Sequence, residues 1–493
     1  MSVKPDWRLG SAESSSFTLF KVNEPSQIYW KLLLSIKNKR ICNASPSDSW
    51  KSWRSLDLTE KFDIIVVGAG ILGVASAYYL QKNNPNKSIL LVDSQPDAGQ
   101  ANTAMSAAAI RNMFSSSTNQ LLTDTSIDFF RHIQEDLNFD LSLHFCGYLW
   151  LLSERQFKEP SVQTWMQRME ANDITYRVIE KPELQKLIPG LVTDFSGDEE
   201  AELMNLNNVD YALFGAECGV LDPSLLVQFY KDEFLKLTKV KPRFNLHVEQ
   251  LLLEAQPSLG LPGEPLVWQN KLVTGIKTKQ GEIHADKIVV AVGPWTNTLL
   301  DPVGIPSYVK AKKRQLFMVA ASDHQPLEEI LFAKGFNKTG FIPFTILPSG
   351  GVYLRGVPEE KSFWIGCADK VGRTYKYTME EDDYNAERAY YEQSVYPVLS
   401  KYFPAFSNAR PGNMWAGDYA YSIDAIPLVY EHSGVIAVTG ASGSGIMKAD
   451  ALGRITDALY RDESEAELYG GRKMSSTALG LVNRDVEVEN VLI

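Results

Sequence analysis

The sequence predicts an α/β protein, an α+β composite in which a discontinuous Rossmann-like domain is interrupted by an inserted antiparallel sheet. Three segments predict the Rossmann-like part: a glycine-rich strand, turn and helix at residues 62–84, a buried strand that ends at Gly293, and a second strand, small-residue loop and helix at residues 434–461. Because long stretches of chain separate these segments, one domain built from all three must be discontinuous.

The first segment has the residues that a nucleotide-binding turn needs. Residues 62–67 are rich in β-branched side chains and predict a buried parallel strand, which Gly68, Gly70 and Gly73 follow. Gly68 permits the tight turn out of the strand, Gly70 lets the backbone approach a pyrophosphate, and Gly73 lets the next helix pack closely on the strand. The N–H groups at the start of that helix then point at the phosphates.

A second strand supports the same interpretation. Residues 88–92 are apolar and end at Asp93, which lies 20 residues after Gly73. At that distance the dinucleotide fingerprint places a carboxylate that accepts hydrogen bonds from ribose hydroxyls. The ordered series of strand, glycines, helix, strand and acid therefore predicts a dinucleotide site.

The two later segments extend this site. Residues 272–281 alternate and turn as a hairpin does, and residues 283–293 form a buried strand that ends at Gly293. Without a side chain, Gly293 lets the backbone lie against a cofactor. Residues 434–440 predict another strand, residues 441–447 a glycine-rich turn, and residues 449–461 a helix whose N-terminus suits an anion or an electron-rich ring.

The intervening regions predict a separate sheet with flanking helices. Their strands should be antiparallel, since turn signals divide short apolar runs. The expected strands are residues 314–319, 341–347, 351–355 and 363–367, and the expected helices are residues 118–137, 161–171, 223–237 and 380–402.

Composition excludes several classes of protein. At 493 residues the chain is too long for one simple core, and 44% hydrophobic and 22% charged residues are typical of a soluble globular protein. A net charge of −11 argues against nucleic-acid binding. No apolar run approaches the roughly 20 residues of a membrane-spanning helix. The four cysteines and six histidines are scattered, so we expect reduced thiols and no metal site.

Residues 1–60 form an N-terminal extension with two open interpretations. Basic residues are frequent at Lys31, Lys37 and Arg40, as in a mitochondrial import signal, but Asp6 and Glu13 are unusual in one. The extension could equally pack on the domain that follows.

Together these segments resemble the D-amino-acid oxidase superfamily of FAD enzymes. The likeness covers residues 68–111, 285–295 and 415–453 in the order that this superfamily has. It implies FAD as the cofactor, a small amine or amino acid as the substrate and an unidentified electron acceptor. The implied domains are an FAD-binding domain at residues 61–115, 200–300 and 410–465, a substrate (cap) domain at residues 116–199 and 301–409, and a C-terminal tail at residues 466–493.

Within the superfamily, the chain is similar to the FAD-dependent oxidoreductase domain-containing proteins linked to assembly of mitochondrial respiratory complex I. Short motifs at residues 146–154, 219–223, 404–406, 415–419 and 488–493 carry this likeness. It implies a mitochondrial location, in the matrix or on the matrix side of the inner membrane, and complex I assembly intermediates as partners. The cytoplasm is the alternative.

By position, the resemblance assigns the FAD contacts to glycines, small residues and one acid. They are Gly68, Gly70 and Gly73 at the pyrophosphate, Asp93 at the adenosine ribose, Thr103, Ser106 and Ala107 along the flavin's approach, Gly293 at the end of its strand, and Gly443, Ser444, Gly445, Ile446 and Lys448 at the pyrimidine end.

Departures from the oxidases of this superfamily carry further expectations. Ser444 stands where sarcosine oxidases commonly have histidine, and Gly417 lies near the position of their covalent flavin cysteine. FAD is therefore expected to be held without a covalent bond. Trp364 lies near the position of the lysine that activates oxygen, which favours a dehydrogenase over an oxidase.

The candidate catalytic residues are Lys448, Arg355 and Tyr419, with Arg111 as a further cation that could hold a substrate carboxylate. Each charge could instead form a structural ion pair, and the tyrosine could belong to the core. The predicted activity is hydride transfer from a C–H beside an amine nitrogen to FAD. The alternatives are a flavin-stabilised assembly factor without significant turnover, and a NAD(P)-linked dehydrogenase, which would leave the two later segments unexplained.

Overall fold

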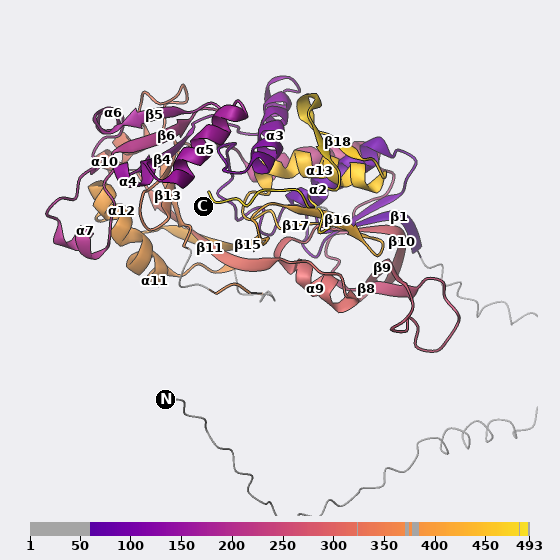
Figure 1. The fold of residues 1–493 in the computed structure, drawn as a ribbon. Coiled ribbons are helices and arrows are strands. Elements are labelled where there is room, and N and C mark those ends of the chain that lie inside the picture. The colour runs from indigo at the N-terminus through magenta and orange to yellow at the C-terminus, as the bar shows by residue number, and fades with distance from the viewer. Residues whose placement is uncertain (1–59, 323, 370–373, 377–383, 483, 492–493) are drawn as a thin grey trace, which may run out of the picture. The chain divides into compact units, whose positions relative to one another are not determined.

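The computed structural model describes residues 60–491 apart from 323, 370–373, 377–383 and 483. The predicted N-terminal extension, with its import-signal interpretation, lies outside the described residues, as do residues 492 and 493. The part from residue 59 onward forms one compact unit. It contains two large sheets with helices packed against them (Figure 1).

The first sheet is the Rossmann-like one. Its parallel centre is made by β1, which pairs with β2 on one side and β10 on the other, and β10 also pairs in parallel with β17. Its strands are β16 (Leu428–His432), β17 (Val435–Thr439), β10 (Gly281–Val290), β1 (Glu60–Val67) and β2 (Ile89–Val92), extended by β9 (Lys271–Thr278) and β8 (Val248–Ala255). Since helices or loops cover both faces, β2 and β17 are fully buried, and β1 and β10 are apolar and buried at their carboxyl ends.

Helices from distant parts of the sequence pack on this sheet. α2 (Ile71–Asn83) lies between α13 (Ala449–Tyr460) and α8 (Pro223–Leu237), and α3 (Ser117–Glu135) packs on α13. Gly453 makes the close approach of α13 to α2 possible, because a Cβ there would lie 2.9 Å from the carbonyl oxygen of Ala75.

The second sheet has eight strands and is antiparallel except where β12 pairs with β4. Its order is β15 (Asn413–Tyr421), β11 (Lys310–Ala320), β14 (Ser362–Cys367), β13 (Val352–Val357), β12 (Phe344–Ile346), β4 (Tyr148–Leu152), β6 (Tyr211–Gly215) and β5 (Arg177–Glu180). This sheet confirms the predicted inserted antiparallel sheet, and its four predicted strands correspond to β11–β14.

Short elements complete the fold. Two strand pairs, β3 (Ala109–Ile110) with β7 (Gly219–Val220) and β18 (Glu465–Glu467) with β19 (Lys473–Ser475), lie outside the large sheets. The remaining α-helices of the described residues are α4 (Glu154–Phe157), α5 (Pro160–Ala171), α6 (Lys181–Leu187), α7 (Glu199–Leu203), α9 (Thr296–Leu300), α10 (Gln325–Leu331), α11 (Arg388–Tyr390) and α12 (Tyr396–Tyr402).

The helix expected at residues 380–402 is divided. α11 passes through a π-helical turn at residues 391–395 into α12, in whose first turn Pro397 lies. Proline lacks the N–H that a continuous α-helix would use, so the ladder shifts there. Residues 377–383 lie outside the described part of the chain.

The domain boundaries differ from those expected. β6, expected in the FAD-binding part, pairs with β4 and β5, and β15, also expected there, is the edge strand of the eight-stranded sheet. α3, expected in the substrate part, contributes Leu122 and Phe130 to the core around α2. Backbone pairing with strands far along the chain decides these memberships, and local sequence does not encode it.

The described residues contain no helix that is both long and apolar enough to span a bilayer. They also contain no cluster of three or more histidine, cysteine, aspartate or glutamate side chains that could hold a metal ion.

Candidate functional site

A large cavity, open to solvent, lies at the carboxyl ends of the parallel strands. Its wall is formed by the turn after β1, the loop after β2, the end of β10, the loop after β17 and part of β15. Crevices at this edge of an open α/β sheet are where such folds bind ligands. The three segments identified in the sequence therefore meet at one site.

The glycines of the first turn have different physical roles. A Cβ at Gly73 would lie 1.8 Å from the carbonyl oxygen of Gly68, and a Cβ at Gly68 would lie 2.5 Å from that of Ala291. Both glycines are therefore required by packing. A Cβ at Gly70 would meet only the Thr103 hydroxyl, at 3.5 Å, and one at Gly293 would meet nothing within 4 Å. Gly70 and Gly293 thus keep the cavity itself free of side chains.

Asp93 closes one end of this cavity. Its carboxylate accepts hydrogen bonds from the backbone N–H groups of Ala69 (2.6 Å) and Gln95 (2.8 Å). These contacts hold the side chain beside the glycine turn. A ribose hydroxyl placed there would find a charged acceptor already oriented.

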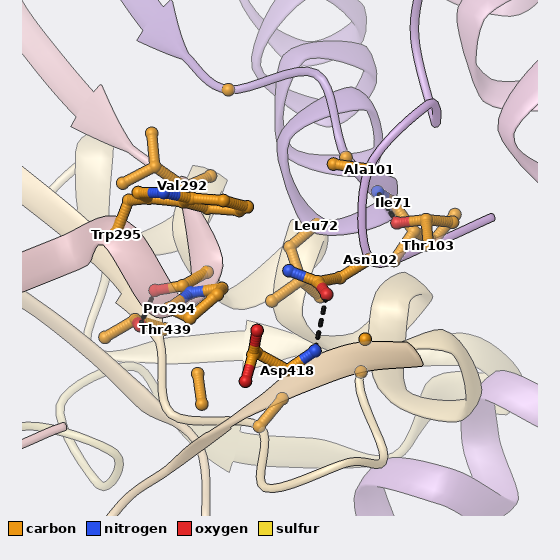
Figure 2. A pocket seen from close by; sticks show the side chains of 18 of the residues that line it. Ile71, Leu72, Ala101, Asn102, Thr103, Val292, Pro294, Trp295, Asp418 and Thr439 are labelled. Atoms are coloured by element: carbon orange, nitrogen blue, oxygen red, sulfur yellow. Dashed lines mark hydrogen bonds between the residues drawn. The ribbon is translucent and has the colours of Figure 1, made fainter. Parts of the chain in front are cut away.

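Asn102 presents an unused donor to the cavity. Its Oδ1 accepts from the backbone N–H of Asp418 at 2.7 Å, whereas its Nδ2 is buried and has no hydrogen-bond partner among the described residues (Figure 2). A buried amide donor without a partner is costly. A ligand with oxygen or nitrogen acceptors would satisfy it, so the lining of this cavity fits the polar groups of a dinucleotide.

Thr103 links the same loop to the helix. Its hydroxyl accepts from the backbone N–H of Ile71, the first residue of α2, at 3.2 Å (Figure 2). This hydrogen bond ties the start of α2, which follows the glycine turn, to the loop after β2.

The third segment forms a tight loop against Tyr419. Gly443 has φ +84°, and a Cβ there would lie 2.2 Å from the Tyr419 ring. Ser442 donates its backbone N–H to the carbonyl of Ala420, which fixes the loop against β15. The glycine therefore allows the Tyr419 ring to approach the backbone of this loop closely.

A smaller cavity adjoins the first, since both are lined by Ser106, Ala107, Tyr353, Tyr419, Ser442 and Gly443. Aromatic rings surround it: Tyr148 stacks on Phe344 at 4.5 Å, and Phe344 stacks on Tyr353 at 5.2 Å between centroids. Burial raises the pKa of Tyr148, Tyr353 and Tyr419, so all three are neutral phenols over the ordinary pH range. This cavity suits a small organic molecule.

Arg111 supplies a positive charge to the small cavity. Arg111 is 4% exposed, and its guanidinium lies 4.1 Å from the centroid of the Phe114 ring. It donates to two backbone carbonyls, Met113 at 2.8 Å and Val491 at 2.7 Å. Burial lowers its pKa, but an arginine side chain stays charged in a protein. The two carbonyls orient this charge, and the nearby Glu489 carboxylate attracts it without forming an ion pair with it, so Arg111 can still bind an anion.

The sequence-predicted residues divide between the cavities and their support. Residues that line the large cavity are Gly68, Gly70, Asp93, Thr103, Ser106, Ala107, Gly293, Gly443, Gly445, Ile446 and Tyr419. Gly73 acts through packing, and Ser444 lines only the small cavity.

Arg355 and Lys448 were expected to be catalytic, but neither side chain lines the large or the small cavity. The Arg355 guanidinium lies 4.6 Å from the centroid of the Trp364 ring and donates to the carbonyl of Ala107. Lys448 is fully buried, and its Nζ donates to the Ser444 hydroxyl at 2.6 Å. Both cations support the cavity walls from behind.

Burial lowers the pKa of Lys448 from 10.5 to about 7, against the opposing effect of Glu489. Between these values the unfolded chain binds one more proton than the folded protein, so this residue makes stability rise with pH. We expect wild type, compared with a Lys448→Met variant, to gain about 2 kcal/mol in free energy of unfolding from pH 7 to pH 9. Denaturant unfolding of both proteins at each pH measures this gain, and a constant difference would contradict it.

Arg314 is a cavity-lining cation that sequence reasoning did not find. It pairs with Asp369 at 2.8 Å and donates to the Tyr421 hydroxyl at 2.9 Å. The sequence does indicate an unusual strand here, because residues 310–314 contain four basic residues just before a mainly apolar run. Asn102 was also missed, since a single asparagine in a small-residue loop carries no distinguishing pattern.

Comparison with known proteins agrees with this geometry. The family described as FAD dependent oxidoreductase (DAO) matches residues 63–459. FAD-dependent oxidoreductase domain-containing protein 1 of Xenopus laevis is 24% identical, over 92% of this chain and 90% of the relative. Monomeric sarcosine oxidase of Bacillus sp. (strain B-0618) is 23% identical, over 82% and 93%. The structure of L-proline dehydrogenase from P. horikoshii has the same fold, with TM-score 0.64 and 21% identity, over 82% of this chain and 94% of that one.

Proposed function

Because this chain belongs to the DAO family of FAD-dependent oxidoreductases, whose cofactor is FAD, we propose that it oxidises a carbon–nitrogen bond of a small amino acid or N-alkyl amino acid. The observation that supports this substrate class is the position of Arg111 in a small aromatic cavity beside the cofactor cavity. A carboxylate on Arg111 would orient the rest of such a molecule toward the shared wall at Ala107 and Tyr419.

Bound FAD supplies the redox chemistry, since it accepts a hydride from a C–H beside an amine nitrogen. The chain's own residues would hold the cofactor and orient it. Gly70 and Gly293 leave room for the cofactor, Asp93 would accept from its ribose, and the free amide N–H of Asn102 would donate to an acceptor on it.

Residues of the small cavity would position the substrate. Arg111 holds the carboxylate, while Tyr148, Phe344 and Tyr353 exclude water from the amine end. Removing water strengthens the ionic contact, because the effective dielectric constant falls. Orientation of this kind supplies a large part of the catalytic effect in a reaction whose bond chemistry belongs to the cofactor.

We further propose a dehydrogenase that passes electrons to an acceptor other than oxygen. A cation beside the flavin favours the reduction of oxygen to an anionic species, since one unit charge at about 4 Å contributes about 4 kcal/mol at an effective dielectric constant of about 20. Near the position of the oxidases' lysine this chain has Trp364, and Arg314, the cation that lines the cofactor cavity, is paired with Asp369.

An anaerobic flavin-bleaching screen tests the proposal. We expect one or more of sarcosine, dimethylglycine, glycine, proline and D-amino acids to bleach the flavin absorbance, and the reduced protein to recover its colour slowly in air. No bleaching by any amino acid, together with bleaching by amines that lack a carboxylate, would contradict the substrate class. Rapid recovery in air would contradict the dehydrogenase assignment alone.

The proposed place of work is the mitochondrion, with complex I assembly intermediates as partners and the cytoplasm as the alternative. This proposal is supported by the resemblance to the complex I-linked FAD-dependent oxidoreductases. A fusion of residues 1–60 to a fluorescent reporter tests it, and a reporter confined to the cytosol would count against it. A non-enzymatic assembly factor is the second candidate, favoured by Ser444 in place of the histidine of the sarcosine oxidases.

A further inference from the structure

The C-terminal segment, residues 484–491, lies against the wall of the small cavity. Arg484 forms two hydrogen bonds with the carboxylate of Asp424, at 2.6 and 2.8 Å, and donates to the carbonyl of Ile426 at 3.0 Å. The backbone N–H of Glu489 donates to the carbonyl of Asp424 at 2.9 Å. Ala425, between these contacts, lines the small cavity. The segment is therefore attached to one wall of the substrate site.

Glu489 anchors the same segment at a second wall. The residue is 3% exposed, and its carboxylate accepts from the backbone N–H and the hydroxyl of both Ser115 and Ser116, at 2.6 to 3.1 Å. Asn119 adds a further hydrogen bond at 3.1 Å. Ser116 is the N-cap of α3, where a carboxylate is favoured by the unpaired N–H groups of the helix. So many donors make Glu489 the main attachment of the end of the chain.

Val491 carries this attachment to Arg111. Its backbone N–H donates to the Glu489 carboxylate at 2.9 Å, and its carbonyl accepts from Arg111 at 2.7 Å. The other acceptor of the Arg111 guanidinium, the carbonyl of Met113, lies two residues away along the chain. One of the two hydrogen bonds that orient Arg111 thus depends on the last residues that the structure describes.

We propose that residues 489–491 position Arg111 so that its guanidinium presents its remaining N–H groups to a substrate carboxylate. A guanidinium has five N–H donors, and the two carbonyls use two of them. Within the described part of the chain the other three N–H groups form no hydrogen bond, and Arg111 lines the small cavity. Glu489 is a positioning residue here, and the inference rests on the proposed function of Arg111.

The test compares two ligands of equal shape on the flavin-loaded protein. Benzoate carries a carboxylate and benzamide is its uncharged analogue, and titration of the flavin absorbance spectrum gives the dissociation constant of each. We expect Glu489→Gln to weaken benzoate binding about tenfold, since it disturbs a charge-assisted contact, and to leave benzamide binding within about twofold. The glutamine side chain of this variant would place an NH₂ donor against the Ser115 and Ser116 N–H groups that now donate to the Glu489 carboxylate.

Glu487→Gln is the matched control, two residues away in the same segment. Glu487 accepts from the backbone N–H of Ser117 at 2.9 Å and pairs with Arg168 at 3.3 Å, but its 41% exposed side chain has no contact with Arg111. The dissociation constant of benzoate from Glu487→Gln should equal that from wild type. A second variant that ends at Val488 removes both Glu489 and Val491 and should reproduce the loss of benzoate binding.

The outcomes separate this inference from the proposed function. Unchanged benzoate binding in both Glu489→Gln and the shortened chain, beside a clear loss in Arg111→Met, would overturn the positioning role alone. Equal losses for benzoate and benzamide would overturn it too, because they would indicate a general collapse of the cavity. If Arg111→Met itself binds benzoate normally, the proposed substrate site and this inference both fail.

Discussion

Replacing Gly70 with valine is expected to abolish FAD binding while the flavin-free protein still folds. Gly70 has φ −67° and ψ 176°, an extended conformation that any residue adopts, and its Cβ direction points at open cavity except for the Thr103 hydroxyl. The new side chain would therefore occupy the space that the pyrophosphate needs. Absorbance of the purified variant measures the loss directly.

The stability of this variant should equal that of flavin-stripped wild type. A ligand bound only by the folded state adds RT ln(1 + [L]/Kd), which is about 4 kcal/mol at 1,000 times Kd. Gly73→Ala is the contrasting variant, because its Cβ would lie 1.8 Å from the Gly68 carbonyl oxygen. It should not fold at all, with or without FAD. Normal flavin content in Gly70→Val would show that the cofactor does not pass this turn.

Replacing Arg111 with methionine is expected to lower flavin reduction by a carboxylate-bearing substrate at least about 100-fold at subsaturating concentration. Methionine keeps the apolar contact with Phe114 but removes the charge. Truncating one partner of a buried, hydrogen-bonded charge pair typically costs about 2–5 kcal/mol. Most of the loss should appear as weaker binding, because the reacting C–H bond is elsewhere on the substrate.

Anaerobic rapid mixing over a range of substrate concentrations separates binding from the rate of reduction. The control is the same variant with the amide of the substrate, which cannot form the ion pair and should react as it does with wild type. Equal impairment of acid and amide would indicate that Arg111 only supports the cavity wall. An unchanged rate with the acid would remove Arg111 from the substrate site.

The nucleotide-binding part of the fold could be predicted because its signals are local. Gly68, Gly70, Gly73 and Asp93 lie within one strand–helix–strand unit, where spacing along the chain and distance in space are closely related. The strand that ends at Gly293 and the loop before α13 were also found from their composition. Each of these segments forms its turn by its own backbone requirements, so the sequence carries the information directly.

The roles of the cations could not be predicted in this way. Arg355 and Lys448 were chosen as catalytic because they are cations near expected site segments, yet the structure places Arg355 over Trp364 and Lys448 against Ser444. The direction in which a side chain points depends on strand register and helix rotation, and a shift of one residue in a strand reverses it. Arg314 faces the cofactor cavity for the same reason, through the pairing of β11 with β15.

By itself, the sequence determined that this chain binds a dinucleotide with a discontinuous α/β domain, which segments forming an antiparallel sheet interrupt along the chain. The tertiary structure alone decided which side chains complete the site. Arg111 and Val491 are 380 residues apart and meet only because the end of the chain binds the N-terminus of α3 through Glu489. Such contacts form where segments distant in sequence pack together, and the composition of neither segment specifies its partner.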